Sequence, residues 1–170
     1  MFGIPINDYV ISSRASLDDI ADVIGPLEVV VPNDELEALG FRAGETALID
    51  ASNLETFVRP CNIPGNFSGA GRMERQQVYV NGVMKRITTL LGEPLSSAWE
   101  DLKKAEDSVM TDITRSRYLS LINTFKSTSY SEGNYYIPEG EYSTASQYAE
   151  FQPDMEKLRA KVVELFYIER

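Results

Sequence analysis

The side chains most often used in catalysis are nearly missing from this sequence. Its 170 residues contain no histidine, the commonest general base and metal ligand, and one cysteine, Cys61. A single thiol excludes an intramolecular disulfide, and without histidine the sequence lacks the usual ligand set of a zinc site. The nucleophile motif G-x-S-x-G is also absent from the sequence. We therefore predict no catalytic residue, no metal site and no cofactor, and a protein that is not an enzyme.

Carboxylates remain as candidates for acid–base chemistry, because the chain carries 26 Asp and Glu against 16 Lys and Arg. A pair of carboxylates can cleave a glycosidic bond, so a carboxylate-dependent enzyme is one hypothesis for function. No spacing among the acids singles out one pair, however, and no catalytic carboxylate is assigned.

The net charge of −10 is unevenly distributed along the chain. The first lysine is Lys85, and residues 127–156 contain acidic side chains without any Lys or Arg. Nucleic-acid affinity comes largely from cations that neutralise phosphates, so we expect no sequence-specific nucleic-acid binding. An acidic surface that binds a basic partner or mimics DNA is one hypothesis for function, beside a plain solvated surface.

Tyrosine is the other distinctive side chain, concentrated in a Ser-, Gly-, Asn- and Glu-rich segment over residues 127–152. Tyrosine offers a large contact area at low entropic cost, and loops of this length are often functional or disordered. The segment is therefore expected to contact a neighbouring subunit or partner, or alternatively to be a flexible solvated loop. The candidate interface residues are Tyr130, Tyr135, Tyr136, Tyr142 and Tyr148.

The elements that would position these side chains divide the chain at about residue 92. Residues 1–92 are predicted to be β-rich after a short helix whose capping box pairs Ser16 with Asp19. Asn33 is expected to cap one helical turn, which Gly40 ends. The predicted strands are 27–31, 46–50 and 54–58, followed by a loop with Gly and Pro over 60–72.

A β-hairpin is predicted around Asn81-Gly82, between the apolar segments 78–80 and 83–87. Both central positions of a type I′ turn need positive φ, which Asn and Gly tolerate best. The β-branched residues on both sides favour strands over a helix.

Residues 93–170 are predicted to be helical. Apolar residues recur at helical spacing over 96–126, which indicates one long amphipathic helix. A closing helix is expected after Pro153, because proline suits the first turn. The predicted fold class is α+β, with a small β-rich, barrel-like N-terminal part, the long helix, the Tyr-rich loop and a C-terminal helix.

No apolar run approaches the roughly 20 residues needed to cross a membrane. Residues 1–8 have neither the basic region nor the apolar stretch of a secretory signal. We therefore expect no membrane contact.

Residues 27–50 combine a strand, a short helical turn, a Gly-Glu turn and a second strand. Within them Arg42, Gly44, Glu45 and Thr46 match the short pattern R-x-G-[DE]-T. This order resembles the β core of head–tail joining (connector or stopper) proteins of tailed phages. The resemblance implies a virion structural protein, assembled in the host cytoplasm as an oligomeric neck ring. Its partners would be copies of itself and portal or tail components.

The same residues resemble the swapped-hairpin module of AbrB-type transition regulators, which share the pattern P-x-x-[DE]-L. That family binds DNA through basic residues, whereas Arg42 is the one basic residue within 27–58. This departure argues against DNA binding. The first hypothesis is thus a phage head–tail connector subunit acting through protein–protein contacts. The alternative is an acidic regulatory or DNA-mimic module, which would be cytoplasmic.

Overall fold

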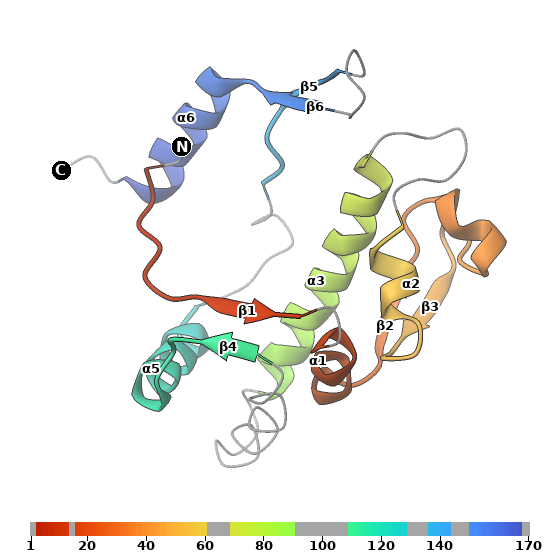
Figure 1. The fold of residues 1–170 in the computed structure, drawn as a ribbon, viewed down its shortest axis with the longest axis horizontal. Helices are drawn as coiled ribbons and strands as arrows, with labels where there is room; N and C mark the ends of the chain where they lie inside the picture. Colours follow the sequence, from red (N-terminus) through yellow and green to blue (C-terminus); the bar gives the residue numbers. More distant parts are fainter. Residues whose placement is uncertain are drawn as a thin grey trace. The chain divides into compact units, whose positions relative to one another are not determined.

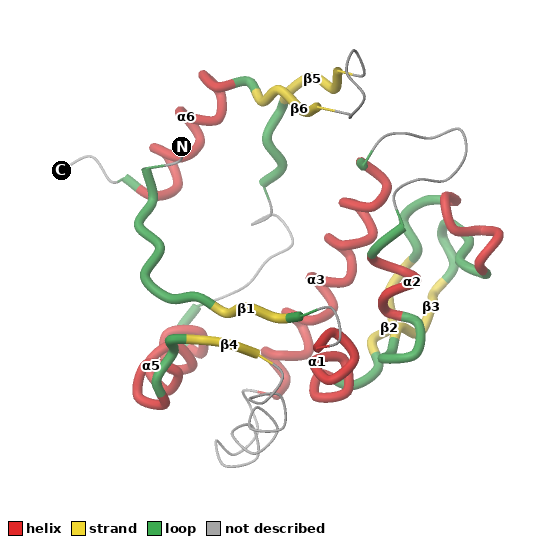
Figure 2. Tube along the Cα trace, in the orientation of Figure 1, coloured by secondary structure: helices red, strands yellow, loops and turns green. Residues whose placement is uncertain are grey.

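The computed structural model describes residues 3–13, 16–60, 69–90, 109–128, 136–143 and 150–167. The chain forms two compact units, one made of Asp8–Glu132 and the other of Met1–Asn7 with Gly133–Arg170 (Figure 1). Helices and small antiparallel sheets alternate in both, which confirms the α+β class (Figure 2). The described strands pair only two by two, so the predicted barrel does not form from them. The domain boundary at residue 92 stays a prediction.

Unit Asp8–Glu132 holds most of the elements. Its strands are β1 (Val10–Ser12), β2 (Leu27–Val30), β3 (Thr46–Ile49) and β4 (Val109–Thr111), paired as β1 with β4 and β2 with β3. Its helices are α1 (Ser16–Ile24), the 3₁₀ helix η1 (Asp34–Leu39), α2 (Leu54–Val58), α3 (Ala70–Leu90) and α5 (Arg115–Lys126).

The β2–β3 pair confirms two predicted strands and provides the base of the core. Leu27 and Val29 alternate with exposed residues along β2, and Leu27 lies opposite Ile49 of β3. These inward side chains pack with Leu36 of η1 and Phe57 of α2, and α3 contacts β2. Burying these apolar side chains holds α3 in place beside the sheet.

The caps of η1 are those predicted. The side chain of Asn33 accepts a hydrogen bond from the Glu35 N–H at 3.4 Å, and Gly40 ends the helix with φ 91°. At the start of α1, Ser16 pairs with Ser13, and the predicted capping box between Ser16 and Asp19 stays a prediction. Ser13 N–H donates to Ser16 Oγ at 2.9 Å, and Ser16 N–H donates to Ser13 Oγ at 3.2 Å.

The predicted hairpin at Asn81-Gly82 is wrong, because both residues lie inside α3. Neither has the positive φ that a type I′ turn requires. A Cβ added to Gly82 would lie 3.5 Å from Leu27 Cδ1, so this position faces β2 at close range. Packing against the sheet has overridden the local β-propensity of the flanking residues.

The predicted strand over 54–58 is also wrong, because these residues form α2. Leu54 and Phe57 are both buried, and a three-residue separation brings them to one face of a helix. The Phe57 ring lies 5.2 Å from the ring of Phe41, centroid to centroid, which anchors α2 in the core.

The predicted long helix over 96–126 is replaced, in its described part, by β4 and α5. Val109–Thr111 pairs with β1, and Thr114 then caps α5 by accepting from the Arg117 N–H at 3.3 Å. The strand pairing and this N-cap explain the break in the helix. The earlier part of the predicted helix, 96–108, lies outside the described residues.

The second unit contains β5 (Gly140–Ser143), β6 (Glu150–Pro153) and α6 (Met155–Phe166). The closing helix is confirmed, and Asp154 caps it by accepting from the Glu156 and Lys157 N–H groups. The predicted loop over 127–152 is wrong where β5 and β6 pair. Tyr167 Oη donates to Gly3 O at 2.5 Å and ties the chain's beginning to this unit.

Candidate anion-binding site

The first turns of α3 carry Arg72 and Arg75, three residues apart and therefore neighbours on the helix surface. The start of a helix leaves N–H groups without intrahelical partners and carries the positive end of the helix dipole. Side chains of α3 also reach the end of α2 and the residues around η1. Guanidinium groups at a helix N-terminus are a favourable arrangement for an anion.

Arg75 is the buried centre of this region, with an exposed fraction of 0%. Its Nε donates to Phe57 O at 2.9 Å, and its Nη2 donates to Pro60 O. Its Nη1 donates to Glu35 Oε2 at 2.5 Å and to Asn33 Oδ1 at 3.1 Å. Because internal partners engage this guanidinium and it has no access to solvent, Arg75 joins α2, η1 and α3 and does not face a ligand.

Arg59 is the C-cap of α2, and the backbone carbonyls on both sides of it accept hydrogen bonds from α3. Gln76 Nε2 donates to Val58 O at 3.1 Å, beside the two carbonyls that Arg75 holds. The Arg59 side chain itself is 56% exposed, and its Nη1 donates to Glu55 Oε1 at 2.6 Å. An exposed ion pair of this kind is weak in water. Its guanidinium can therefore exchange Glu55 for an anionic ligand.

Arg72 lies one turn before Arg75 and has a different environment. Its Nε is buried and has no hydrogen-bond partner among the described residues. The described part of the chain contains no ion pair to Arg72 either. A buried unpaired donor costs about 1–3 kcal/mol, so an acceptor placed here would gain from pairing with it. Arg72 is thus the side chain that most directly indicates an anion site.

Hydrogen bonds and one buried ion pair engage the other polar side chains of the region. The Asn33 side-chain amide donates to Gly71 O at 3.0 Å and to Glu74 Oε2 at 2.9 Å. Glu35 neutralises Arg75, whose charge would otherwise be buried without compensation. The positive charge without a buried carboxylate partner comes from Arg72, from Arg59, whose pair with Glu55 is exposed, and from the helix terminus.

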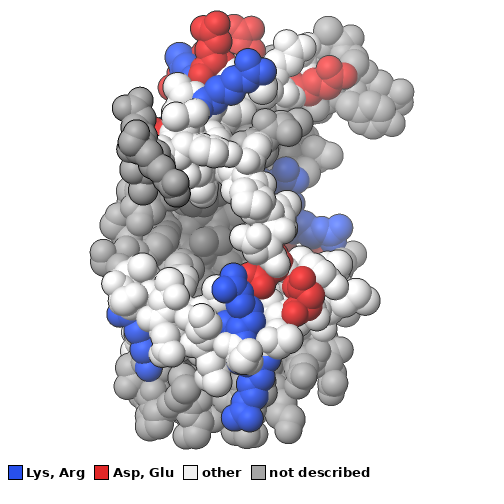
Figure 3. Space-filling view, turned by 90° about the vertical axis from the view of Figure 1, so that its left-hand side faces the viewer, with Lys and Arg blue, Asp and Glu red and all other residues white. Residues whose placement is uncertain are grey.

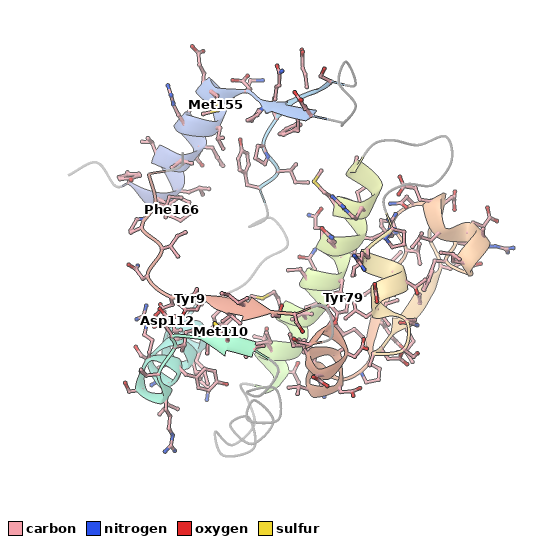
Figure 4. The ribbon with its side chains drawn as sticks, in the orientation of Figure 1. Tyr9, Tyr79, Met110, Asp112, Met155 and Phe166 are labelled. Carbon is pink, nitrogen blue, oxygen red and sulfur yellow. The ribbon has the colours of Figure 1, made fainter. Side chains whose placement is uncertain are left out.

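A second group of charged side chains joins β1 to β4 and α5. Arg117 Nη2 lies 2.6 Å from Asp8 Oδ2, and its Nε also donates to this carboxylate. The hydrogen bond from Arg117 holds the pKa of Asp8 below its ordinary value. Tyr9 N–H donates to Asp112 Oδ1 at 2.9 Å, and Figure 4 shows both residues beside Met110. These groups pair with one another and stabilise the β1–β4 pair.

On α3, Tyr79 packs against the hydrophobic core, and burial raises the pKa of its phenol (Figure 4). The face drawn in Figure 3 carries basic and acidic side chains in several separate groups among uncharged ones. Within the described ranges, no three acidic or cysteine side chains converge on a possible metal position. None of the described helices combines the length and apolar character needed to cross a membrane.

The candidate interface tyrosines are only partly described. Tyr136 is half-buried, and Tyr142 belongs to β5. Tyr130, Tyr135 and Tyr148 lie outside the described residues. Their role in an interface therefore stays a prediction.

Sequence reasoning missed Arg59, Arg72 and Arg75 as candidate site residues. The available signal was the pair Arg72 and Arg75, spaced for one helix face in a chain with few basic residues. This signal was missed because residues 60–72 were predicted to be a loop and 78–87 a hairpin. The helix that brings the two arginines together was therefore not predicted.

Comparison with known proteins identifies the family. The sequence pattern of the LytR_cpsA_psr family matches residues 1–162. The chain belongs to this family. Comparison with curated proteins gives no match.

Solved structures share the fold. TagV of B. subtilis aligns with 99% of this chain and 67% of its own length, at a TM-score of 0.71 and 19% identity. The Lin1025 protein of Listeria innocua aligns with 95% and 69%, at a TM-score of 0.65 and 19% identity. A structure of TagT bound to LI-WTA aligns with 96% and 61%, at a TM-score of 0.66 and 15% identity. The chain thus spans between 61% and 69% of the length of these three structures.

Family membership overturns the functional predictions made from the sequence. The family comprises cell-wall glycopolymer transferases, so both the phage connector and the absence of enzymatic function are wrong. The acidic regulatory or DNA-mimic module is not supported either. Portal and tail partners are wrong, because the family acts on cell-wall glycopolymer and lipid-linked substrates. A virion or cytoplasmic location without membrane contact is wrong for a family associated with the bacterial membrane and cell envelope. The short pattern around Arg42 to Thr46 reflects a tight turn before β3, where Gly44 has φ 80°.

Proposed function

We propose that this chain provides the anion-binding part of a transferase that acts on a lipid-linked cell-wall glycopolymer. The phosphate of the donor would bind at the start of α3, between Arg72 and Arg59. Family membership supports the class of reaction. The buried Nε of Arg72, which has no partner among the described residues, is the observation that carries the location.

The two arginines have different tasks in this proposal. Arg72 supplies a partly desolvated guanidinium, whose hydrogen bonds to an anion are stronger than those made in water. Arg59 supplies an exposed guanidinium that exchanges Glu55 for the incoming phosphate. Charge compensation of this kind at a transferring or leaving phosphate stabilises developing negative charge.

Inorganic pyrophosphate is a suitable soluble probe, because its two linked phosphoryl groups can engage two arginines. Its binding to the wild-type chain and to Arg72→Gln can be measured by isothermal titration calorimetry. A charge-assisted hydrogen bond contributes about 1.5–3 kcal/mol, so Arg72→Gln should weaken binding by roughly 10- to 100-fold.

Arg42→Gln is the matched control, because Arg42 forms an exposed pair with Glu37 at a separation of 3.3 Å. This variant removes the same charge from the same unit and should bind pyrophosphate as the wild type does. Equal binding by Arg72→Gln and Arg42→Gln would place the anion elsewhere.

A further inference from the structure

Glu35 lies where η1 meets the start of α3, and its side chain is 14% exposed. On one side its Oε2 accepts a hydrogen bond from Arg75 Nη1 at 2.5 Å. On the other side it lies against Gly71, where an added Cβ would overlap the Glu35 carboxylate. The absence of a side chain at position 71 therefore permits the carboxylate to approach α3.

The partner of Glu35 controls the backbone around Arg59. Arg75 donates to the carbonyls of Phe57 and Pro60, which flank Arg59 in the sequence. A guanidinium is a rigid planar fork, so its orientation fixes these bonds together. Removing the carboxylate from Nη1 would leave a fully buried cation without compensation, and the fork would turn or draw in water. Either change alters the position of the 57–60 backbone.

We propose that Glu35 is a positioning residue for the anion site. Through Arg75 it fixes the 57–60 backbone, and through that backbone it sets where the Arg59 guanidinium meets the donor phosphate. Gly71 contributes to this positioning, because its missing side chain leaves the space that the Glu35 carboxylate occupies. This inference rests on the proposed function.

The test compares Glu35→Gln with Glu37→Gln in the full chain. Glutamine keeps the shape of Glu35 and an acceptor for Arg75 but removes the charge. Glu37 lies in the same 3₁₀ helix and pairs with Arg42 at the exposed surface, so its variant is the matched control. We expect Glu35→Gln to weaken inorganic pyrophosphate binding about tenfold, as small misplacements of a binding group do, and Glu37→Gln to leave it unchanged.

A second comparison separates positioning from a general loss of structure. In an Arg59→Gln background, Glu35→Gln should add no further loss of pyrophosphate affinity, because the group it positions is already gone. Independent effects would instead multiply. In an assay of transfer from a lipid-linked glycopolymer donor, Glu35→Gln should raise KM for the donor more than it lowers kcat. Arg59→Gln should change the two constants in the same way.

Gly71→Ala displaces the Glu35 carboxylate from the side of α3. It tests the positioning role if Glu35→Gln does not fold. It should also weaken pyrophosphate binding, with no further effect in the Arg59→Gln background. Wild-type affinity in Glu35→Gln, or a loss that persists undiminished in the Arg59→Gln background, overturns the positioning role. Failure of the wild-type chain to bind pyrophosphate would instead count against the proposed function.

Discussion

Arg75 offers the sharpest test of how the region around α3 is held together. Substituting it with Met keeps much of the side-chain volume and removes the guanidinium. The carboxylate of Glu35 then loses its buried partner, and the carbonyls of Phe57 and Pro60 lose a donor. Breaking a buried ion pair costs roughly 3–5 kcal/mol. Because Glu35 keeps 14% exposure and some hydration, we expect the lower end, about 3 kcal/mol.

Urea denaturation followed by far-UV circular dichroism measures this loss as a lower transition midpoint at constant m-value. The corresponding fall in Tm is on the order of 10 °C for a unit of this size. Arg59→Met is the matched control, because it removes an exposed guanidinium paired with Glu55 and should change stability by at most about 0.5 kcal/mol.

A double variant tests the physical reason for the loss. Replacing both Arg75 and Glu35 with Met removes the uncompensated charge and should recover part of the stability, since apolar pairs can replace buried ion pairs. The stabilising role of this buried ion pair is refuted if Arg75→Met destabilises no more than Arg59→Met does. It is also refuted if the double variant loses the sum of the two single effects, because that would mean that the two charges do not interact.

Three further predictions address other parts of the chain. Gly82→Ala should stabilise the protein by about 0.5–1 kcal/mol in thermal unfolding, because position 82 is helical and an added Cβ meets only ordinary contacts, whereas a hairpin turn would be destabilised. Arg117 holds the pKa of Asp8 below 3.8, so the stability difference between wild type and Asp8→Asn should be complete above about pH 4. It should shrink as the pH falls through the lowered folded-state pKa; a difference that grew on acidification would contradict this pairing. Gly140→Ala should lower Tm, because its Cβ would overlap the backbone oxygen of Gln152 across the β5–β6 pair; an unchanged Tm would mean that this pairing is not kept in solution.

Local signals predicted the elements whose folding depends on their own residues. Asn33 and Gly40 cap η1 as expected, because a side-chain acceptor and a left-handed glycine act within one turn of backbone. The strands β2 and β3 followed from the β-propensity of their residues, and α6 followed from its spacing of apolar residues.

Elements that depend on distant packing were missed. Asn81-Gly82 has the composition of a tight turn, yet Gly82 lies in a helix that approaches Leu27 and Val29 some fifty residues earlier in the sequence. The break before α5 arises from the pairing of β4 with β1, which no local pattern around residue 109 reveals. The anion site could not be found for the same reason. Arg59 and Arg72 can share the proposed site only because α2 contacts α3 and Arg75 joins the two helices.

The central claim is that Arg72 binds the phosphate of a lipid-linked glycopolymer during transfer. The most direct measurement is the transfer rate from a purified lipid-linked glycopolymer to cell-wall material, compared among the wild type, Arg72→Gln and Arg42→Gln. The wild type and Arg42→Gln should both transfer the glycopolymer, and Arg72→Gln should do so at a rate at least about tenfold lower. Arg72→Gln should fold as stably as the wild type, because it loses a buried unpaired donor. Wild-type transfer by Arg72→Gln would contradict the role of Arg72 in binding the donor phosphate.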